Sequence, residues 1–210
     1  MPKAGAFFII LLLAFTTLLY AQEDDGDAPF DDDWDIYAPD LYGRGDQTFI
    51  ISLGTVFPTV FINNGKAIEH NFSPPVGGTL YLSYNYFFNS NLYTGGEVSF
   101  LFMPTLREKI LYVIPFGARI GYQFNLWRFE FPLTYTLGMV WHRYDGFGYY
   151  GLYMKAGGAA YYRFSSDWSF GITANWLWLP QWTRENGERT PHKDVYGNVV
   201  DVMLSARYHF

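Results

Sequence analysis

The amino-acid sequence predicts an all-β fold, namely a closed antiparallel up-and-down transmembrane β-barrel of eight strands. After Gln47, apolar residues alternate with polar or small residues with a period of two, in blocks of about ten residues. Aromatic residues make up 21% of the chain and charged residues only 16%, well below the quarter typical of soluble domains. The links between the blocks alternate between short and long, as they do in barrels that cross a membrane.

The N-terminal residues 1–21 have the pattern of a signal peptide. Lys3 gives a short positive region, an apolar run extends from Ala4 to Leu19, and Ala21 offers a small residue for cleavage before Gln22. The alternative is an uncleaved membrane anchor, but the run is short of the roughly 20 residues that a spanning helix needs. We therefore expect the mature protein to begin at Gln22.

Residues 22–46 form an acidic segment that we expect to be a flexible extension. This segment holds half of the chain's 20 acidic residues against a single base, Arg44, so the formal net charge of −6 belongs mainly to it. High charge and few core-forming residues are typical of a solvated chain. The remaining region, residues 47–210, is nearly neutral and is predicted to form the barrel.

Eight blocks of alternating residues follow one another within the barrel region. In most blocks one face is rich in aromatic and branched apolar residues, and the other face carries polar, charged or glycine residues. The blocks lie within residues 49–57, 79–88, 97–102, 112–123, 129–138, 152–162, 168–178 and 201–210. The alternative fold is a soluble β-sandwich or a lipocalin-like barrel, but its outer faces would be polar, whereas here they are the most apolar part of the sequence.

The links between the blocks predict two unlike ends. Tight turns are expected at Asn89–Asn91, Asn125–Trp127 and Ser165–Asp167, and longer loops at residues 58–75, 104–109, 141–149 and 180–198. Pro115 and Pro132 fall inside predicted strands, where proline removes a ladder hydrogen bond and often marks a bulge. A bulge there would exchange the inward and outward faces locally.

Six ionisable residues fall at inward positions of the predicted strands: Glu97, Arg119, Glu130, Lys155, Asp201 and Arg207. A basic side chain facing lipid at mid-depth costs about 2–4 kcal/mol, so we expect these residues to face the lumen as ion pairs. Counting from the turns places Glu97, Arg119, Glu130 and Arg207 in one tier, with Lys155 and Asp201 in a higher tier. The pairs either seal and rigidify a filled interior, or form a gate that opens a narrow path by exchanging partners.

The C-terminus carries a further pattern, Tyr208-His209-Phe210, with aromatic residues at the last and third-last positions. It resembles the C-terminal assembly signal of bacterial outer-membrane proteins, although Ser205 stands where that signal usually has glycine. With the predicted signal peptide and eight blocks, the chain resembles the small eight-stranded outer-membrane barrel families typified by the OmpA membrane domain, OmpX and OmpW. The resemblance implies insertion by the outer-membrane assembly machinery and contact with outer-membrane lipid. The alternating link lengths predict that the long loops are extracellular, and the even strand number then places both termini in the periplasm.

These patterns favour a non-enzymatic outer-membrane barrel with a structural or surface role, a mostly filled charged and aromatic lumen, and surface-exposed loops. One alternative, suggested by the resemblance to OmpW-like barrels, is a narrow porin-like conduit for small or apolar solutes. Less favoured alternatives are an adhesin whose loops bind a host or surface ligand, and an enzyme that modifies lipid A.

Candidate catalytic residues are scattered among the predicted loops: His70, Ser73, His142, Asp145 and His192. No local motif unites a nucleophile, a base and an orienting acid among them. The chain has no cysteine, so thiolate metal sites, cysteine nucleophiles and disulfides are excluded. We expect no cofactor, no metal and no nucleic-acid partner.

Overall fold

The computed structural model describes residues 42–210 apart from 69–71, 73, 106–108, 145–146, 183, 186–187, 191 and 193. The predicted signal peptide and residues 22–41 of the predicted extension lie outside the described residues. Within the described part of the chain, no helix has the length and apolar character needed to cross a membrane.

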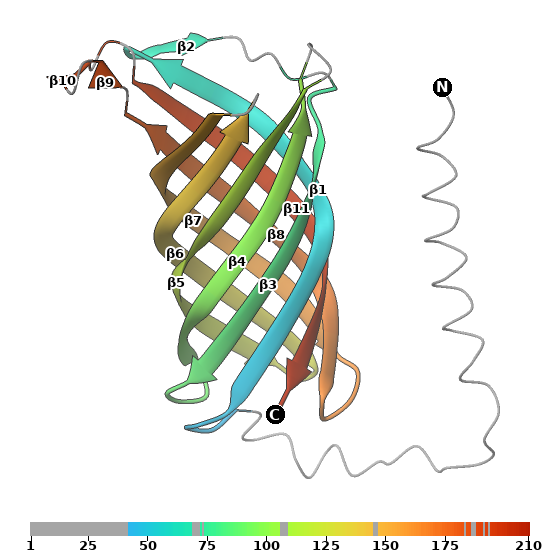
Figure 1. Cartoon of the computed structure of the whole chain (residues 1–210). Helices are drawn as coiled ribbons and strands as arrows, with labels where there is room; N and C mark the ends of the chain where they lie inside the picture. The colour runs from blue at the N-terminus through green and yellow to red at the C-terminus, as the bar shows by residue number, and fades with distance from the viewer. Residues whose placement is uncertain are drawn as a thin grey trace. The chain divides into compact units, whose positions relative to one another are not determined.

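Eight long antiparallel strands form a closed barrel, which confirms the predicted fold class (Figure 1). Each long strand pairs with the next one along the chain, and the last pairs with the first to close the sheet. The strands are β1 (Gln47–Asn63), β3 (Gly77–Phe87), β4 (Leu92–Pro104), β5 (Ile110–Leu126), β6 (Phe129–Tyr144), β7 (Phe147–Arg163), β8 (Trp168–Gln181) and β11 (Val195–His209). Closure matters in lipid because an unpaired N–H or C=O group there costs several kcal/mol.

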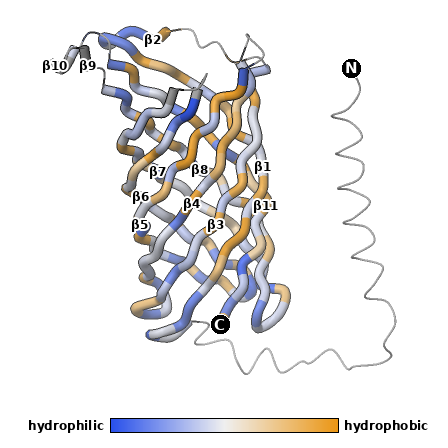
Figure 2. Tube along the Cα trace, in the orientation of Figure 1, coloured by the Kyte–Doolittle hydropathy of each residue, from blue (hydrophilic) through white to orange (hydrophobic). Residues whose placement is uncertain are grey.

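The two faces of the barrel wall follow the period-two pattern, and Figure 2 shows hydrophobic and hydrophilic residues alternating along the strands. Outward residues such as Leu204, Leu133 and Ile172 are 69%, 56% and 55% exposed. Their neighbours on the same strands, for example Met203 and Ser205, are buried in the lumen. An apolar exterior of this extent is unfavourable in water and suits the hydrocarbon of a membrane.

The two ends of the barrel differ, as the link lengths predicted. At the turn end, short links join β3 to β4, β5 to β6 and β7 to β8, and the C-terminal Phe210 lies at this end (Figure 1). At the loop end, three unpredicted short strands occur: β2 (Lys66–Ile68) pairs with β1, and β9 (Arg184–Glu185) pairs with β10 (Glu188–Arg189).

Several links are shorter than the sequence predicted, because the strands extend beyond the predicted blocks. The turn expected at Asn125–Trp127 lies instead at residues 127–128, because β5 extends to Leu126 and β6 begins at Phe129. The loop expected at residues 141–149 shrinks because β6 and β7 continue pairing as far as Tyr144 and Phe147.

Neither Pro115 nor Pro132 shifts the register of its strand. Pro115 pairs with Val140, and Pro132 pairs with Gln123, without an extra residue on either strand. On its other side each proline interrupts the ladder, since proline has no N–H to donate. The inward and outward faces of β5 and β6 are therefore those that the alternation predicted.

A β-bulge lies in β1 instead, between Pro58 and Val60. Its extra residue is Thr59, whose Oγ1 donates a hydrogen bond to the Asn198 carbonyl oxygen at 2.9 Å. Asn198 Nδ2 in turn donates to the Val60 carbonyl oxygen at 3.0 Å, which holds the irregularity in place. Because an extra residue exchanges the faces that follow it, Phe61 lines the lumen where unbroken alternation would turn it to lipid.

Candidate functional site

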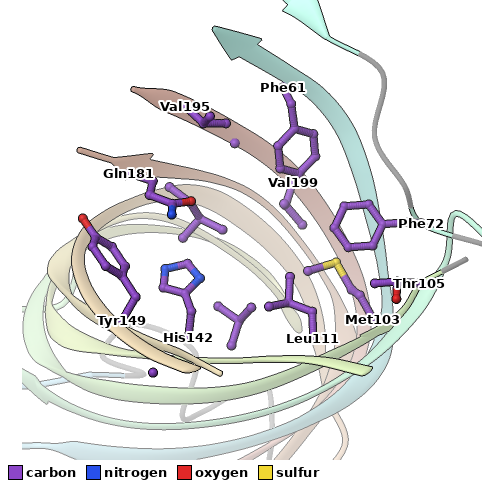
Figure 3. A pocket seen from close by; sticks show the side chains of 14 residues that line it. Phe61, Phe72, Met103, Thr105, Leu111, His142, Tyr149, Gln181, Val195 and Val199 are labelled. Carbon is purple, nitrogen blue, oxygen red and sulfur yellow. The ribbon is translucent and has the colours of Figure 1, made fainter. Parts of the chain in front are cut away.

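An apolar cavity lies in the lumen at the loop end, as Figure 3 shows. Its volume is about 470 Å³. Seven long strands of the barrel and the links that contain Phe72 and Thr105 contribute to its wall. The lining residues are Phe61, Phe72, Met103, Thr105, Leu111, Val113, His142, Gly148, Tyr149, Leu179, Gln181, Val195, Gly197 and Val199.

The chemistry of this cavity is apolar with a few neutral polar groups. Phe61 and Phe72 contact each other on one side, with ring centroids 5.7 Å apart, and His142 and Tyr149 lie 5.8 Å apart on another. Within the described part of the chain, none of the lining residues is charged. Such a cavity favours a ligand that carries no charge, since a charge moved into it would lose its hydration without gaining a partner.

A layer of buried apolar side chains closes the cavity from below. Val113, Val199 and Met103 belong to both the cavity wall and this layer, and each is at most 1% exposed. The layer as a whole consists of Val56, Leu101, Met103, Val113, Val140, Tyr153, Leu177, Leu179 and Val199. We call this layer the floor, and it makes the cavity blind toward the turn end.

Beneath the floor lies a first charged cluster around Glu97, which is 7% exposed. Lys155 Nζ forms an ion pair with Glu97 Oε1, and Arg119 Nε lies 3.9 Å from Glu97 Oε2. The hydroxyls of Tyr81, Thr136 and Tyr153 donate hydrogen bonds to the same carboxylate at 3.2, 3.0 and 3.1 Å. A carboxylate so fully surrounded by donors meets the requirement that a buried charge be paired and hydrogen-bonded.

A second cluster surrounds Glu130 nearer the turn end, and the carboxylate of Glu130 is fully buried. Arg207 Nη1 lies 2.9 Å from Glu130 Oε2, and Arg163 Nη1 lies 3.6 Å from Glu130 Oε1. Arg207 Nη1 also donates to Gln123 Oε1 at 2.6 Å. These contacts fill the lumen with side chains at this level.

The predicted grouping into tiers was wrong. Lys155, expected in the higher tier with Asp201, pairs with Glu97, whereas Glu97 and Glu130 belong to different clusters. Asp201 accepts a hydrogen bond from Asn175 Nδ2 at 2.7 Å, and among the described residues no cation lies within ion-pair distance of it.

The strand register explains this error. Strands in a barrel are tilted and staggered, so residues at equal distances from a turn lie at different heights. The ladder leads from Glu97 through Gly117 and Gly138 to Tyr153, two residues from Lys155. Counting along single strands could not reveal this relation.

Two residues of the lower lumen were missed by the sequence analysis. Arg163 lies two residues after Tyr161 and faces inward as Tyr161 does. The alternation could have identified it, but the predicted sixth block ends at Tyr162. Tyr42 was assigned to the flexible extension, yet its side chain is 2% exposed and packs inside the turn end.

The predicted assembly residues lie at the seam of the barrel. Tyr208 and Phe210 face outward, with ring centroids 5.6 Å apart. The backbone of Phe210 exchanges hydrogen bonds with that of Gln47, at 3.0 and 3.1 Å, so the C-terminal residue completes the closure between β11 and β1.

Only two of the scattered catalytic candidates, His142 and His192, lie within the described residues. His142 lies in the cavity wall, His192 is exposed, and His70, Ser73 and Asp145 lie outside the described residues. Across the residues that the structure describes, no three His, Cys, Asp or Glu side chains gather in a way that could hold a metal ion.

Solved structures with a similar fold are small outer-membrane barrels. Neisserial surface protein A matches 79% of this chain and 97% of its own, with a TM-score of 0.54 and 10% identity. OprG from Pseudomonas aeruginosa matches 80% of this chain and 97% of its own, with a TM-score of 0.50 and 11% identity. At these identities the likeness shows the fold.

Similar sequences come from Treponema pallidum (strain Nichols), where two proteins described as uncharacterized match. One is 28% identical over 134 residues, which is 64% of this chain and 59% of that protein. The other is 27% identical over 170 residues, 71% of this chain and 56% of that protein. The aligned part thus spans less than two thirds of the length of either relative. A family model of an uncharacterized Treponema family matches residues 25–208, and the chain belongs to this family.

Proposed function

We propose that the protein is a non-enzymatic barrel of the bacterial outer membrane that binds a small, neutral, apolar molecule at the cell surface without conducting it. The observation that carries this proposal is the blind cavity of about 470 Å³ at the loop end, which stops at the floor. The loop end faces the outside of the cell. The turn end, where β1 begins and β11 ends, faces the periplasm.

A membrane location is supported by the exterior of the barrel. Its apolar side chains surround the wall, and the strands close without a free edge. Lipid hydrocarbon accepts such a surface, and the outer membrane is where closed barrels of this fold occur.

A sealed lumen is supported by the three layers beneath the cavity. An eight-stranded barrel is just wide enough for its interior to be filled by side chains. Here the floor is followed by the Glu97 cluster and then by the Glu130 cluster, whose members are between 0% and 7% exposed. A solute that left the cavity toward the turn end would have to separate buried ion pairs in sequence.

The nature of the ligand is supported by size and polarity. Cavities of about 300–1,000 Å³ with mostly apolar walls and a few polar groups are the usual form of small-molecule sites. His142, Tyr149 and Gln181 supply such groups in the present cavity. They are suited to one or two hydrogen bonds with a hydroxyl, carbonyl or amide of an otherwise apolar molecule.

A non-enzymatic role is supported by the same wall. Thr105 Oγ1 donates to the Lys109 carbonyl oxygen at 2.9 Å, so its hydroxyl is already engaged. The described lining residues include no carboxylate that could orient His142 as a base.

Photolabelling of the full-length protein in lipid nanodiscs would test the binding site. A small neutral aryl diazirine should label both the lipid-facing belt and cavity residues such as Leu111 and Tyr149, and the belt serves as an internal standard. Val195→Trp places a large ring in the cavity wall and should reduce cavity labelling relative to the belt at least about threefold. Val202→Trp, on the lipid-facing side of the same strand, is the matched control and should leave the ratio unchanged.

Bilayer recording of the same preparation would test the sealed lumen. We expect no resolved conductance steps from the wild-type protein. Regular unitary steps would contradict the sealed barrel and favour the alternative, a narrow conduit for small or apolar solutes. Equal cavity-to-belt ratios for Val195→Trp and the wild type would contradict the binding site independently.

A further inference from the structure

The residues just before β1 fold back across the turn end, and we call residues 42–46 the strap. Gly45 has a φ of 105°, a conformation that side-chain-bearing residues rarely adopt, and it reverses the chain direction. Asp46 Oδ2 accepts a hydrogen bond from the Gly43 amide at 2.7 Å, which stabilises the turn. Gly45 N donates to the Phe87 carbonyl oxygen at 3.0 Å, and Phe87 N donates to the Asp46 carbonyl oxygen at 2.9 Å.

The turn delivers the side chain of Tyr42 into the lumen. Its ring stacks on Phe87 at a centroid distance of 4.2 Å and an interplanar angle of 14°. The Arg163 guanidinium carbon lies 5.3 Å from the centroid of the same ring. With 2% exposure, Tyr42 is as buried as the residues of the barrel interior, although it lies outside every strand.

The hydroxyl of Tyr42 reaches the lower charged cluster. Tyr42 Oη lies 3.1 Å from His209 Nδ1, and Arg207 Nη1 donates to Tyr42 Oη at 3.3 Å. The same Arg207 nitrogen lies 2.9 Å from Glu130 Oε2. Tyr42 therefore lies between the Glu130–Arg207 ion pair and the turn-end mouth, beside Arg163 and His209.

On its outer side, Tyr42 borders a second cavity of about 230 Å³ at the mouth. Asp46, Ser166 and Asp167 are among its other lining residues, so this cavity is polar and suited to water. Arg163 and His209 also line this cavity, and the Tyr42 ring packs among them between the polar mouth and the Glu130–Arg207 ion pair.

We propose that Tyr42 is a releasable stopper, which shuts the lower lumen against water and is withdrawn by movement of the strap. The strap differs from the strands in how it is held. Near the turn end, the residues of β1 are held by ladders to β3 and β11 on both sides, whereas the strap is tied to β3 through Phe87 and through the contacts of one side chain. When the strap moves away, the eight-stranded wall stays intact and water reaches the Glu130 cluster. Binding of a ligand at the proposed site at the opposite end does not depend on this movement.

The absence of cysteine makes this proposal directly testable by single-cysteine accessibility. Thr48→Cys reports on the lumen beside the stopper, since Thr48 is fully buried and pairs with His209. Ser205→Cys reports on the lumen beyond the Glu130 cluster, one inward position past Arg207 on β11. Both would be made in the full-length protein in nanodiscs and labelled with a cationic methanethiosulfonate reagent.

With Tyr42 present, both cysteines should react slowly. Combining Thr48→Cys with Tyr42→Gly should raise its labelling rate at least about tenfold, while Ser205→Cys stays slow. Added p-cresol, which matches the lost side chain, should restore protection, and toluene should restore less because it cannot bond to His209 and Arg207. Tyr122→Gly, which removes an outward tyrosine of β5 at the same end, is the control and should change neither rate.

Two results would overturn the proposal. One is an unchanged rate for Thr48→Cys after Tyr42→Gly, which would mean that another group closes the mouth. The other is an equal increase at both cysteines, which would mean that the whole barrel has loosened. If Tyr42→Gly does not refold, Gly45→Val provides a second route, because it disfavours the positive φ of the strap and should raise the Thr48→Cys rate with Tyr42 still present.

Discussion

The two halves of the lumen are built on the same eight strands but have opposite chemistry. At the loop end the interior is apolar, hollow and open, with a cavity of about 470 Å³. At the turn end it is charged, filled and closed, with Arg207, Glu130 and Tyr42 packed against one another. A single strand contributes to both halves, since β11 supplies Val199 above and Arg207 below.

This difference shows that the alternation of residues along a strand and the height of a residue along the barrel axis carry separate information. The period of two decides whether a residue faces lipid or lumen, and it does so along the whole strand. The position along the barrel axis decides what the lumen-facing residue must do. Near the floor both faces of a strand are apolar. In β4, Leu101 faces the lumen and Phe102 faces outward, and only their burial distinguishes the two residues.

The largest expected effect is in the charged half. Glu130→Ala leaves Arg207 and Arg163 without their shared carboxylate in a buried site, which typically costs about 3–5 kcal/mol. Urea titration of the protein in lipid vesicles would measure the free energy of unfolding. Asp167→Ala, an exposed carboxylate at the same end, should change it by less than about 0.5 kcal/mol. Equal effects of the two substitutions would remove the distinction between a buried cluster and surface charge.

A smaller effect is expected in the apolar half. Leu101→Ala in the floor should cost about 2 kcal/mol, the lower end of the usual range, since the new space adjoins a cavity that is already open. Leu204→Ala is the matched control, because its side chain faces lipid and is 69% exposed. Urea titration would compare the two, and a larger cost for the control would contradict the assignment of inner and outer faces.

A third substitution tests how tightly the charged half is packed. A Cβ atom at Gly121 would lie 2.2 Å from Tyr93 Cζ, so Gly121→Ala forces this ring to move and should cost about 1–2 kcal/mol. Gly96→Ala is the control, since its Cβ would meet nothing closer than 3.9 Å. Urea titration would measure the free energy of unfolding of both variants. Equal values would show that Tyr93 has room to move.

The smallest effect on stability is expected at the C-terminal residue. Phe210→Ala should change the free energy of unfolding by less than about 0.5 kcal/mol, because the ring is 56% exposed and lies on the outer face. If the terminal pattern is an assembly signal, the variant should nevertheless insert more slowly than Phe170→Ala, an outward phenylalanine on β8. Pulse-labelled cells and the heat-dependent gel mobility of the barrel would measure insertion, and equal rates would contradict the signal.

Much of the fold could be predicted from the sequence because alternation is a local property. The eight blocks correspond to the eight long strands, and the residues assigned to each face lie on that face, as Gly117, Arg119 and Gly121 do in β5. The length of the links also separated the turn end from the loop end.

The arrangement within the lumen could not be predicted because it depends on how strands are offset against one another. Lys155 and Glu97 lie 58 positions apart in the sequence. Three successive strand pairings, of β4 with β5, β5 with β6 and β6 with β7, bring them together. The cavity was hidden for a related reason, since Val113 and Val199 have the composition of lipid-facing residues. The burial of Tyr42 depends on a space that exists only once the barrel has closed.

The bulge at Thr59 has a consequence for how the loop-end cavity changes during evolution. Because the bulge absorbs Thr59 as an unpaired extra residue, deleting Thr59 would join Pro58 to Val60 and leave Phe61 facing the cavity. A single insertion or deletion at this level can therefore be absorbed by gaining or losing a bulge, without exchanging the residues that line the site. Related proteins that differ by one residue at this point of the strand are expected to keep the same lining above it.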